Sequence, residues 1–411
     1  MDMITENKVV PKLRFREFND YWNNYLLGNI AEFLKGKGIS KSELDDDGKT
    51  ECIRYGELYV YYNELIDEVK SKTNLENTVL SKANDVIIPA SGETQLDIAT
   101  CSCVLRSGIA LGGDLNIIRT KNNGLFLSYY LNSKKKFDIA RLSQGSSVVH
   151  IYASQLKKLN LNLPSLIEQK KVASFLSAVD EKLKQLTKKK ELLEDYKKGI
   201  MQKIFSQEIR FKDDNGNNYP NWEEGKLNEL VSTPISDGPH LTPKFIEDGV
   251  PFLSVNNIVD NKIDFKNVRT ISYENHLEFS KKCKPIKNDL LLGKAASVGK
   301  IAIVETDIEF NVWSPLAMIR IKEIYESKYF YFCFQTQTLQ KRIKNFINSS
   351  SQGNIGMGDI GKLIFEFPKS KEEQKKITTL LSSIDKKIES VNHQLEKTKE
   401  FKKGLLQQMF V

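Results

Sequence analysis

The feature of this sequence that most constrains its fold is an internal repeat at an offset of 205 residues, half of the 411-residue chain. Residues 168–205 align without a gap to residues 373–410, and 14 of the 38 aligned positions are identical. A proline, Pro164 or Pro368, precedes each copy and suits the end of a strand. A chain that repeats on this scale is built from two similar units.

Both copies predict a long helix with a heptad pattern. Apolar residues alternate at spacings of three and four over about five heptads, which is typical of a coiled coil. The alternative is an amphipathic helix on a single globular core, but neither copy has the wide apolar face of such a helix. The predicted interface residues are Val172, Leu176, Val179, Leu183, Leu186 and Leu193 in the first copy and Ile377, Leu381, Ile384, Ile388, Val391 and Leu395 in the second.

Fainter repeats flank the helices. Leu13-Arg14-Phe15 with Trp22 returns as Ile209-Arg210-Phe211 with Trp222, and NDVII at 84–88 returns as NDLLL at 288–292. The two tryptophans are expected to pack in the core rather than to stack on bases. Short apolar runs at 98–105 and 300–304 predict strands, and residues 329–347 predict helical segments.

Connectivity predicts how the helices pair. Each globule leads into the start of its own helix, and only a few residues separate the first helix from the second globule. Both conditions hold only if the helices pair antiparallel, and 38 residues then span roughly 57 Å. Two similar domains that differ internally in sequence, held on such a spacer, suit two different, separated half-sites on DNA.

We therefore expect a mixed α/β (α+β) fold: two similar domains joined by two long antiparallel coiled-coil helices, with a pseudo-two-fold internal repeat. The expected boundaries are 1–164 for the first domain, 165–207 for the central helix, 208–368 for the second domain and 369–411 for the C-terminal helix.

The net charge of +8 suggests an anionic partner, but its excess lies in the helices. Residues 165–205 and residues 369–411 each carry 10 Lys and Arg against 6 Asp and Glu, whereas the two globules are almost neutral. DNA contacts in the globules must therefore come from local clusters. The helices contain lysine pairs at 170–171, 197–198, 375–376 and 402–403, for which there are three alternative roles. They reach DNA phosphates, they face an acidic protein partner, or they form ordinary solvated i,i+4 pairs.

Taken together, these features resemble type I restriction-modification specificity subunits. The motifs that carry the resemblance are EQKK at 168–171 and 373–376, KKG at 197–199 and 402–404, PKLRF at 11–15, SDGPH at 236–240, GVPFL at 249–253 and SQGN at 351–354. The resemblance implies two target-recognition domains and a scaffold for two adenine-N6 methyltransferase subunits and two ATP-driven restriction subunits. S-adenosylmethionine, ATP and Mg²⁺ are then expected on those partners, and no cofactor is expected in this chain.

Missing motifs favour a subunit without catalytic residues. The chain has no Pro-Pro for an Asn/Asp-Pro-Pro-aromatic methyltransferase loop and no complete P-loop. Glu-x-Lys at 168–170 and 373–375 formally matches a nuclease motif, but Glu at a helix start also has a dipole explanation. The four histidines are scattered, so no metal site is expected.

The location is expected to be cytoplasmic. The five cysteines are an odd number without framework spacing, as in a reducing compartment. The sequence shows neither a signal peptide nor an apolar run long enough for a membrane span.

Direct readout of DNA needs basic or polar side chains on loops, and glycines let the backbone approach phosphates. An ordinary solvated turn is the alternative at each position, and His240 could equally be a packed turn residue. The candidates in the first domain are Lys35, Lys37, Ser40, Lys41, Arg141, Gln144, Ser146 and Ser147. Those in the second domain are Ser236, His240, Thr242, Lys244, Asn256, Asn257, Gln352 and Asn354.

Two other functions remain open. A non-enzymatic coiled-coil scaffold with protein-binding globular domains would have no salt-dependent affinity for duplex DNA. A stand-alone nuclease or methyltransferase would modify DNA without a partner.

Overall fold

A computed structural model describes residues 9–145, 147–347 and 353–411. Two predicted DNA contacts, Ser146 and Gln352, therefore lie outside the described residues. The contacts divide the chain into two compact units. Unit 2 is Lys189–Val391, and unit 1 combines the chain up to Lys188 with Asn392–Val411. Each unit thus contains one globular domain and a part of both long helices.

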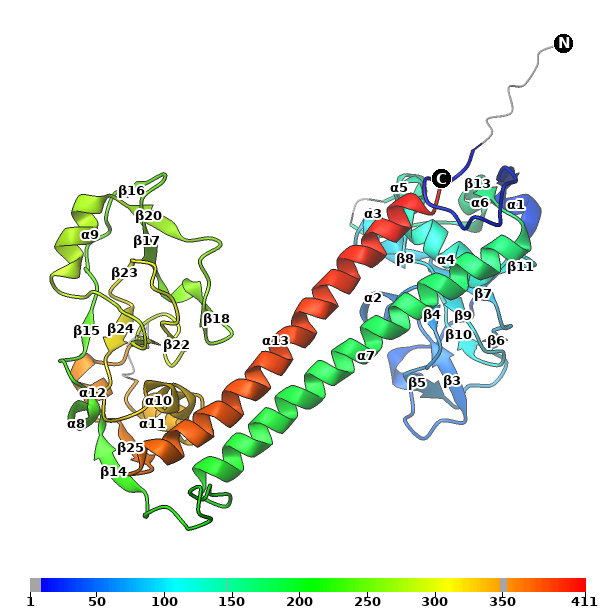
Figure 1. Cartoon of the computed structure of the whole chain (residues 1–411). Helices are drawn as coiled ribbons and strands as arrows, with labels where there is room; N and C mark the ends of the chain where they lie inside the picture. Colours follow the sequence, from blue (N-terminus) through cyan, green and yellow to red (C-terminus); the bar gives the residue numbers. More distant parts are fainter. Residues whose placement is uncertain (1–8, 146, 348–352) are drawn as a thin grey trace. The chain divides into compact units, whose positions relative to one another are not determined.

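The two predicted long helices are confirmed. Helix α7 spans Leu166–Phe205 and helix α13 spans Lys371–Gln408 (Figure 1). Most of the predicted interface residues are buried, namely Val172, Leu176, Val179, Leu186, Ile377, Leu381, Ile384, Val391 and Leu395. Leu183, Leu193 and Ile388 are partly exposed.

The domain of unit 1 is built on a five-stranded sheet in the order β2-β11-β7-β9-β4. The strands are antiparallel except for β4, which runs parallel to β9. The bounds are Ala31–Lys35 for β2, Leu115–Thr120 for β11, Asp85–Pro89 for β7, Ser102–Val104 for β9 and Leu65–Ile66 for β4. Helix α4 (Gly124–Ser133) packs against β7 and β9 and buries most of its side chains. The central strands are buried, which explains why most of their residues are apolar.

A second sheet in unit 1 has the order β5-β3-β10-β6, with β3 and β10 parallel. Its strands are Ser71–Thr73 (β5), Thr50–Ile53 (β3), Ala110–Leu111 (β10) and Val79–Leu80 (β6). Two further pairs are β1 (Asn23–Leu26) with β13 (Asn160–Leu163), and β8 (Ser91–Gly92) with β12 (Val149–His150). The remaining helices are α1 (Leu27–Ile30), α2 (Glu57–Val60), α3 (Gln95–Ile98), α5 (Lys136–Leu142) and α6 (Ala153–Leu156).

Unit 2 repeats this plan with two four-stranded sheets. One has the order β15-β24-β21-β22 and the other β16-β20-β17-β23. The strands of the first sheet are β15 (Ser236–Asp237), β24 (Leu316–Ile319), β21 (Leu290–Gly293) and β22 (Ile301–Ile303). Those of the second sheet are β16 (Phe245–Ile246), β20 (Arg269–Ile271), β17 (Val250–Leu253) and β23 (Asn311–Val312). Two strand pairs complete it, β14 (Glu223–Lys226) with β25 (Ile364–Phe367) and β18 (Ile258–Val259) with β19 (Lys262–Ile263). Its helices are α8 (Leu227–Leu230), α9 (Tyr273–Ser280), α10 (Ser327–Phe334), α11 (Gln337–Asn345) and α12 (Met357–Gly361).

One expected strand is shorter than its apolar run. The run 98–105 contains a strand only at Ser102–Val104, because the Thr94 side chain caps a helical turn at Gln95–Ile98. The helical segments expected at 329–347 are confirmed as α10 and α11, and the Thr336 side chain caps the start of α11.

Each domain shares its hydrophobic core with one end of both long helices. In unit 1, Val172 and Leu176 of α7 lie in one core with Leu405 and Met409 of α13. In unit 2, the core includes Met201 and Ile204 of α7 together with Ile377 and Leu381 of α13. The beginning of one helix and the end of the other therefore belong to the same domain core.

The repeated Glu of EQKK ties each helix to its domain. Arg14 donates two hydrogen bonds of 2.8 Å to the Glu168 carboxylate, and Trp22 Nε1 donates a third. At the equivalent place, Arg210 and Trp222 donate to Glu373. A buried carboxylate needs such partners, so the two Glu residues have a structural role beyond the helix dipole. Trp22 is buried as expected, and Trp222 is partly buried.

The repeated Gln closes the same junction. Gln169 donates to the carbonyl oxygen of Pro164, and Gln374 donates to that of Pro368. Their side-chain oxygens accept backbone N–H groups of the domain, from Asn123 and Glu326 respectively. The prolines follow strands β13 and β25, as predicted.

Candidate functional site

The first candidate loop leaves strand β2 at Lys35 and crosses Gly36 to Ser40. Lys35 and Lys37 are exposed, and Lys37 Nζ donates to the carbonyl oxygen of Asn77. The Ser40 backbone N–H donates to Glu43 at 2.6 Å, which closes a short turn at Lys41–Glu43. Residues 54–56, which follow strand β3 and were not among the candidates, lie at the same site.

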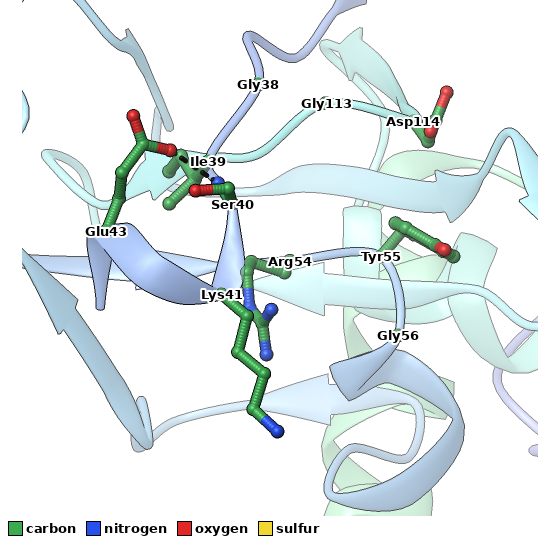
Figure 2. Close-up of a pocket in the computed structure, with 10 residues that line it drawn as sticks. All are labelled: Gly38, Ile39, Ser40, Lys41, Glu43, Arg54, Tyr55, Gly56, Gly113 and Asp114. Atoms are coloured by element: carbon green, nitrogen blue, oxygen red, sulfur yellow. Dashed lines mark hydrogen bonds between the residues drawn. The ribbon is translucent and has the colours of Figure 1, made fainter.

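A pocket of about 570 Å³ lies between these segments (Figure 2). Ser40 and Lys41 line it on one side, and Arg54 and Tyr55 line it on another. The Lys41 and Arg54 side chains project in the same direction in Figure 2. The full lining is Gly38, Ile39, Ser40, Lys41, Glu43, Arg54, Tyr55, Gly56, Gly113 and Asp114.

Arg54 is the least satisfied polar side chain of this pocket. Its Nε is buried and has no hydrogen-bond partner among the described residues. Nε forms an ion pair with the buried Glu57 carboxylate at 3.6 Å, which is outside hydrogen-bond distance. A planar guanidinium in such a pocket can bind a phosphate or a base edge.

The other candidates of the first domain do not line this pocket. Arg141 and Ser147 are exposed, and Gln144 forms a β-bridge with His150. His150 belongs to β12, whose partner is β8, and its Nδ1 lies 3.0 Å from Ser91 Oγ. These residues form a separate surface.

In the second domain, three basic side chains surround Asp237. Its carboxylate is 5% exposed and lies 2.5 Å from Lys282, 3.0 Å from Lys294 and 3.4 Å from His240. Burial by itself would raise the pKa of this carboxyl group, but the hydrogen bonds and charges of Lys282 and Lys294 together lower it. One anion faces three basic groups, so this surface carries an excess of positive charge.

The neighbouring candidates differ in accessibility. Ser236 Oγ is buried without a partner among the described residues, whereas Thr242, Lys244, Asn256 and Asn354 are exposed. Asn257 is engaged inside the domain. It accepts the backbone N–H of Ser254 and donates to the carbonyl oxygen of Asp264.

Sequence reasoning missed Arg54, Tyr55, Lys282 and Lys294. Arg54-Tyr55-Gly56 follows strand β3, and Lys294 follows Gly293 at the end of β21. A basic residue within two positions of a glycine at the end of a strand was the available signal for Arg54 and Lys294.

Among residues 9–145, 147–347 and 353–411, no group of three or more His, Cys, Asp or Glu side chains could hold a metal ion. In the same residues, no helix is both long enough and apolar enough to cross a membrane.

Comparison with known proteins agrees with this architecture. Residues 19–194 and 219–400 match the family described as type I restriction modification DNA specificity domain. The chain is 25% identical to the MjaVIII type I restriction enzyme specificity subunit of Methanocaldococcus jannaschii, over 94% of this chain and 91% of that protein. It is 23% identical to a putative type I specificity subunit of Mycoplasma pneumoniae, over 98% and 99% of the two chains.

The fold is also found in a solved structure. The type I restriction-modification system S subunit from M. genitalium aligns with a TM-score of 0.66 at 17% identity, over 98% of this chain and 99% of that one. Both halves of the chain match the family, and the mixed α/β fold with two long helices is shared. This chain therefore belongs to the type I restriction modification DNA specificity domain family.

Proposed function

We propose that this chain is the DNA-recognition subunit of a type I restriction-modification complex and reads a bipartite, asymmetric target. Residues 1–164 and 208–368 are the two target-recognition domains, one for each half-site. The observation that carries the proposal is that two domains of one plan present different basic surfaces. Lys41 and Arg54 line the first, and Lys282, Lys294 and His240 surround Asp237 on the second. A shared fold with different side chains suits two different half-sites.

The helical segments 165–207 and 369–411 pair as an antiparallel coiled coil that sets the distance between the half-sites. The shared cores support this pairing, because each contains the beginning of one helix and the end of the other. Two reciprocal ion pairs support it as well. Lys197 lies 2.7 Å from Asp385, and Lys402 lies 2.7 Å from Asp180. Both lysines thus pair inside the chain rather than with DNA phosphates.

The helices also provide docking surfaces for two methyltransferase subunits, to which two restriction subunits bind. Tyr196 and Phe401 occupy the same position in the two copies, and each is 53% exposed. Exposed aromatic side chains are typical of protein interfaces. The partners carry S-adenosylmethionine, ATP and Mg²⁺, and this chain contributes no catalytic residue.

Methylation mapping tests the proposal. The chain is co-expressed with its methyltransferase partner, and methylated adenines are located by single-molecule sequencing. We expect a split, asymmetric motif with a fixed gap. If a verified complex methylates no such motif and binds duplex DNA without salt dependence, the proposal is wrong and the globules bind protein instead.

A further inference from the structure

The two domains share a backbone framework around their candidate loops. Gly112 N–H donates to the Ile53 carbonyl at 2.8 Å, and Trp313 N–H donates to the Leu253 carbonyl at the same distance. Each bond extends a parallel strand pair, β3 with β10 and β17 with β23. Arg54 and Ser254, the residues that follow, therefore occupy equivalent positions.

A second pair of hydrogen bonds extends the equivalence. Ala90 N–H donates to the Asp114 carbonyl at 2.7 Å, and Lys294 N–H donates to the Pro315 carbonyl at 2.8 Å. Ala90 and Lys294 are therefore equivalent, and the turn at 112–114 corresponds to the turn at 313–315.

The candidate loops cross this framework at a glycine. Lys35 pairs with Asn116 across one sheet, Asp237 pairs with Ala317 across the other, and a glycine follows each. A Cβ atom at Gly36 would lie 1.9 Å from the Gly112 carbonyl oxygen in the turn, and one at Gly238 would lie 1.6 Å from the carbonyl oxygen of Val312, the residue just before the other turn. The loop backbone thus touches the turn in both domains, and only glycine fits there.

The turn after Arg54 and Ser254 is also shared. The Arg54 N–H donates to the Glu57 side chain, and the Ser254 N–H donates to the Asn257 side chain. The backbone is therefore held alike, while the side chains that it presents differ. Arg54 is replaced by Ser254, Tyr55 by Val255, Ala90 by Lys294 and Lys35 by Asp237.

We propose, building on the proposed function, that this framework is the base-reading site of each domain and that Arg54 is a specificity-determining residue of the first half-site. Arg54 lines an open pocket, and its Nε, which pairs with the Glu57 carboxylate at 3.6 Å, has no hydrogen-bond partner among the described residues. Arginine reads the O6 and N7 acceptors of guanine through two parallel hydrogen bonds. Lys41, on the rim of the same pocket, contacts a phosphate. In the second domain, Lys294 and His240, which both lie beside Asp237, supply the contacts to DNA.

The test compares two arginines of the first domain in the complex with the methyltransferase subunit. Arg54→Ser installs the residue that the equivalent turn already accommodates in the second domain. Arg106→Ser is the matched control, because Arg106 is exposed and pairs with Glu51 elsewhere on the domain. Methylation by each complex is mapped on a library of variant sites.

We expect Arg54→Ser to lose discrimination at one base pair of one half-site, on the order of tenfold or more, and to leave the other half-site unchanged. Arg106→Ser should change neither half-site. Lys294→Met should relax the other half-site alone. Lys41→Ser should weaken binding to all sites equally and lower the salt slope by about one.

A folded Arg54→Ser complex that keeps full discrimination at both half-sites would overturn the inference. If that variant does not fold, Arg54→Lys decides, because lysine keeps the charge and the stem but loses the two-pronged contact. Unchanged specificity of Arg54→Lys would then count against a base contact. A wild-type complex that reads no split motif contradicts the proposed function instead, so the two failures are distinguishable.

Discussion

Glu373 shows how one residue joins a helix to a domain. Its side chain is fully buried, and Arg210 and Trp222 donate hydrogen bonds to its carboxylate. Arg210 lies in the connection between α7 and β14, so the ion pair fixes that connection against the first turn of α13. The same arrangement at Glu168 with Arg14 shows that the motif locks the junction in both units.

Loss of this arginine should destabilise unit 2. Arg210→Met leaves a buried carboxylate without its partner, and we expect a loss of about 3–5 kcal/mol in the free energy of unfolding. Urea denaturation measures it. Lys376→Met is the control, because Lys376 pairs with the exposed Asp214. Equal stability of the Arg210→Met variant and the wild type would show that the ion pair is not needed.

Asp237 predicts a pH dependence of stability. Its pKa is lowered in the folded chain from the ordinary value of 3.8, so it stabilises the fold above that pH. This contribution is lost as the pH falls through the lower, folded value. Asp237→Asn should therefore unfold at a lower temperature than the wild type at pH 7, and the gap should narrow below pH 3.8. A gap that stays constant to pH 3 would contradict this, and Asp307→Asn, at an exposed ion pair, should show none.

At the scale of elements, local and long-range features differ in how far the sequence reveals them. The long helices were predictable because heptad periodicity is local, and the apolar run 300–304 correctly predicted strand β22. The hydrogen-bond partner of Glu168 was not predictable, because Arg14 lies 154 residues away in the sequence. Arg54 and Lys294 were missed because each is a single basic residue, and its surroundings come from strands that only folding brings together.

The docking surface proposed for the two long helices can be tested by substitution of its aromatic residues. Tyr196→Ser and Phe401→Ser each remove one of two equivalent exposed aromatics. Truncation of a central aromatic costs about 2 kcal/mol or more of binding energy. Each variant should bind one methyltransferase subunit instead of two, and the double variant none, as measured by light scattering of the purified complex. Phe137→Ser, at an exposed aromatic of α5, should bind both. Full binding by the double variant would place the docking surface elsewhere.

At the scale of the whole molecule, the proposed spacer can be shortened. Deletion of residues 183–189 and 388–394 removes one heptad from each helix at equivalent positions and keeps the apolar phase. Seven residues correspond to roughly 10 Å of helix, or about three base pairs. We expect a methylated motif with the same half-sites and a gap shorter by about three base pairs. An unchanged gap would refute the spacer, and deletion from one helix alone should abolish complex formation.

Unit 1 combines the first and the last segments of the chain, which has a consequence for folding during synthesis. Leu405, Met409 and Phe410 fill its core, and Tyr130 donates to the carbonyl oxygen of Val411. During synthesis, the first domain therefore cannot complete its core until residues 392–411 are made, after the whole second domain. Until then its unfilled core exposes apolar surface, whereas the second domain obtains its helical segments from residues 189–391 alone. A released chain that ends at residue 391 would therefore carry a complete second domain and an aggregation-prone first one.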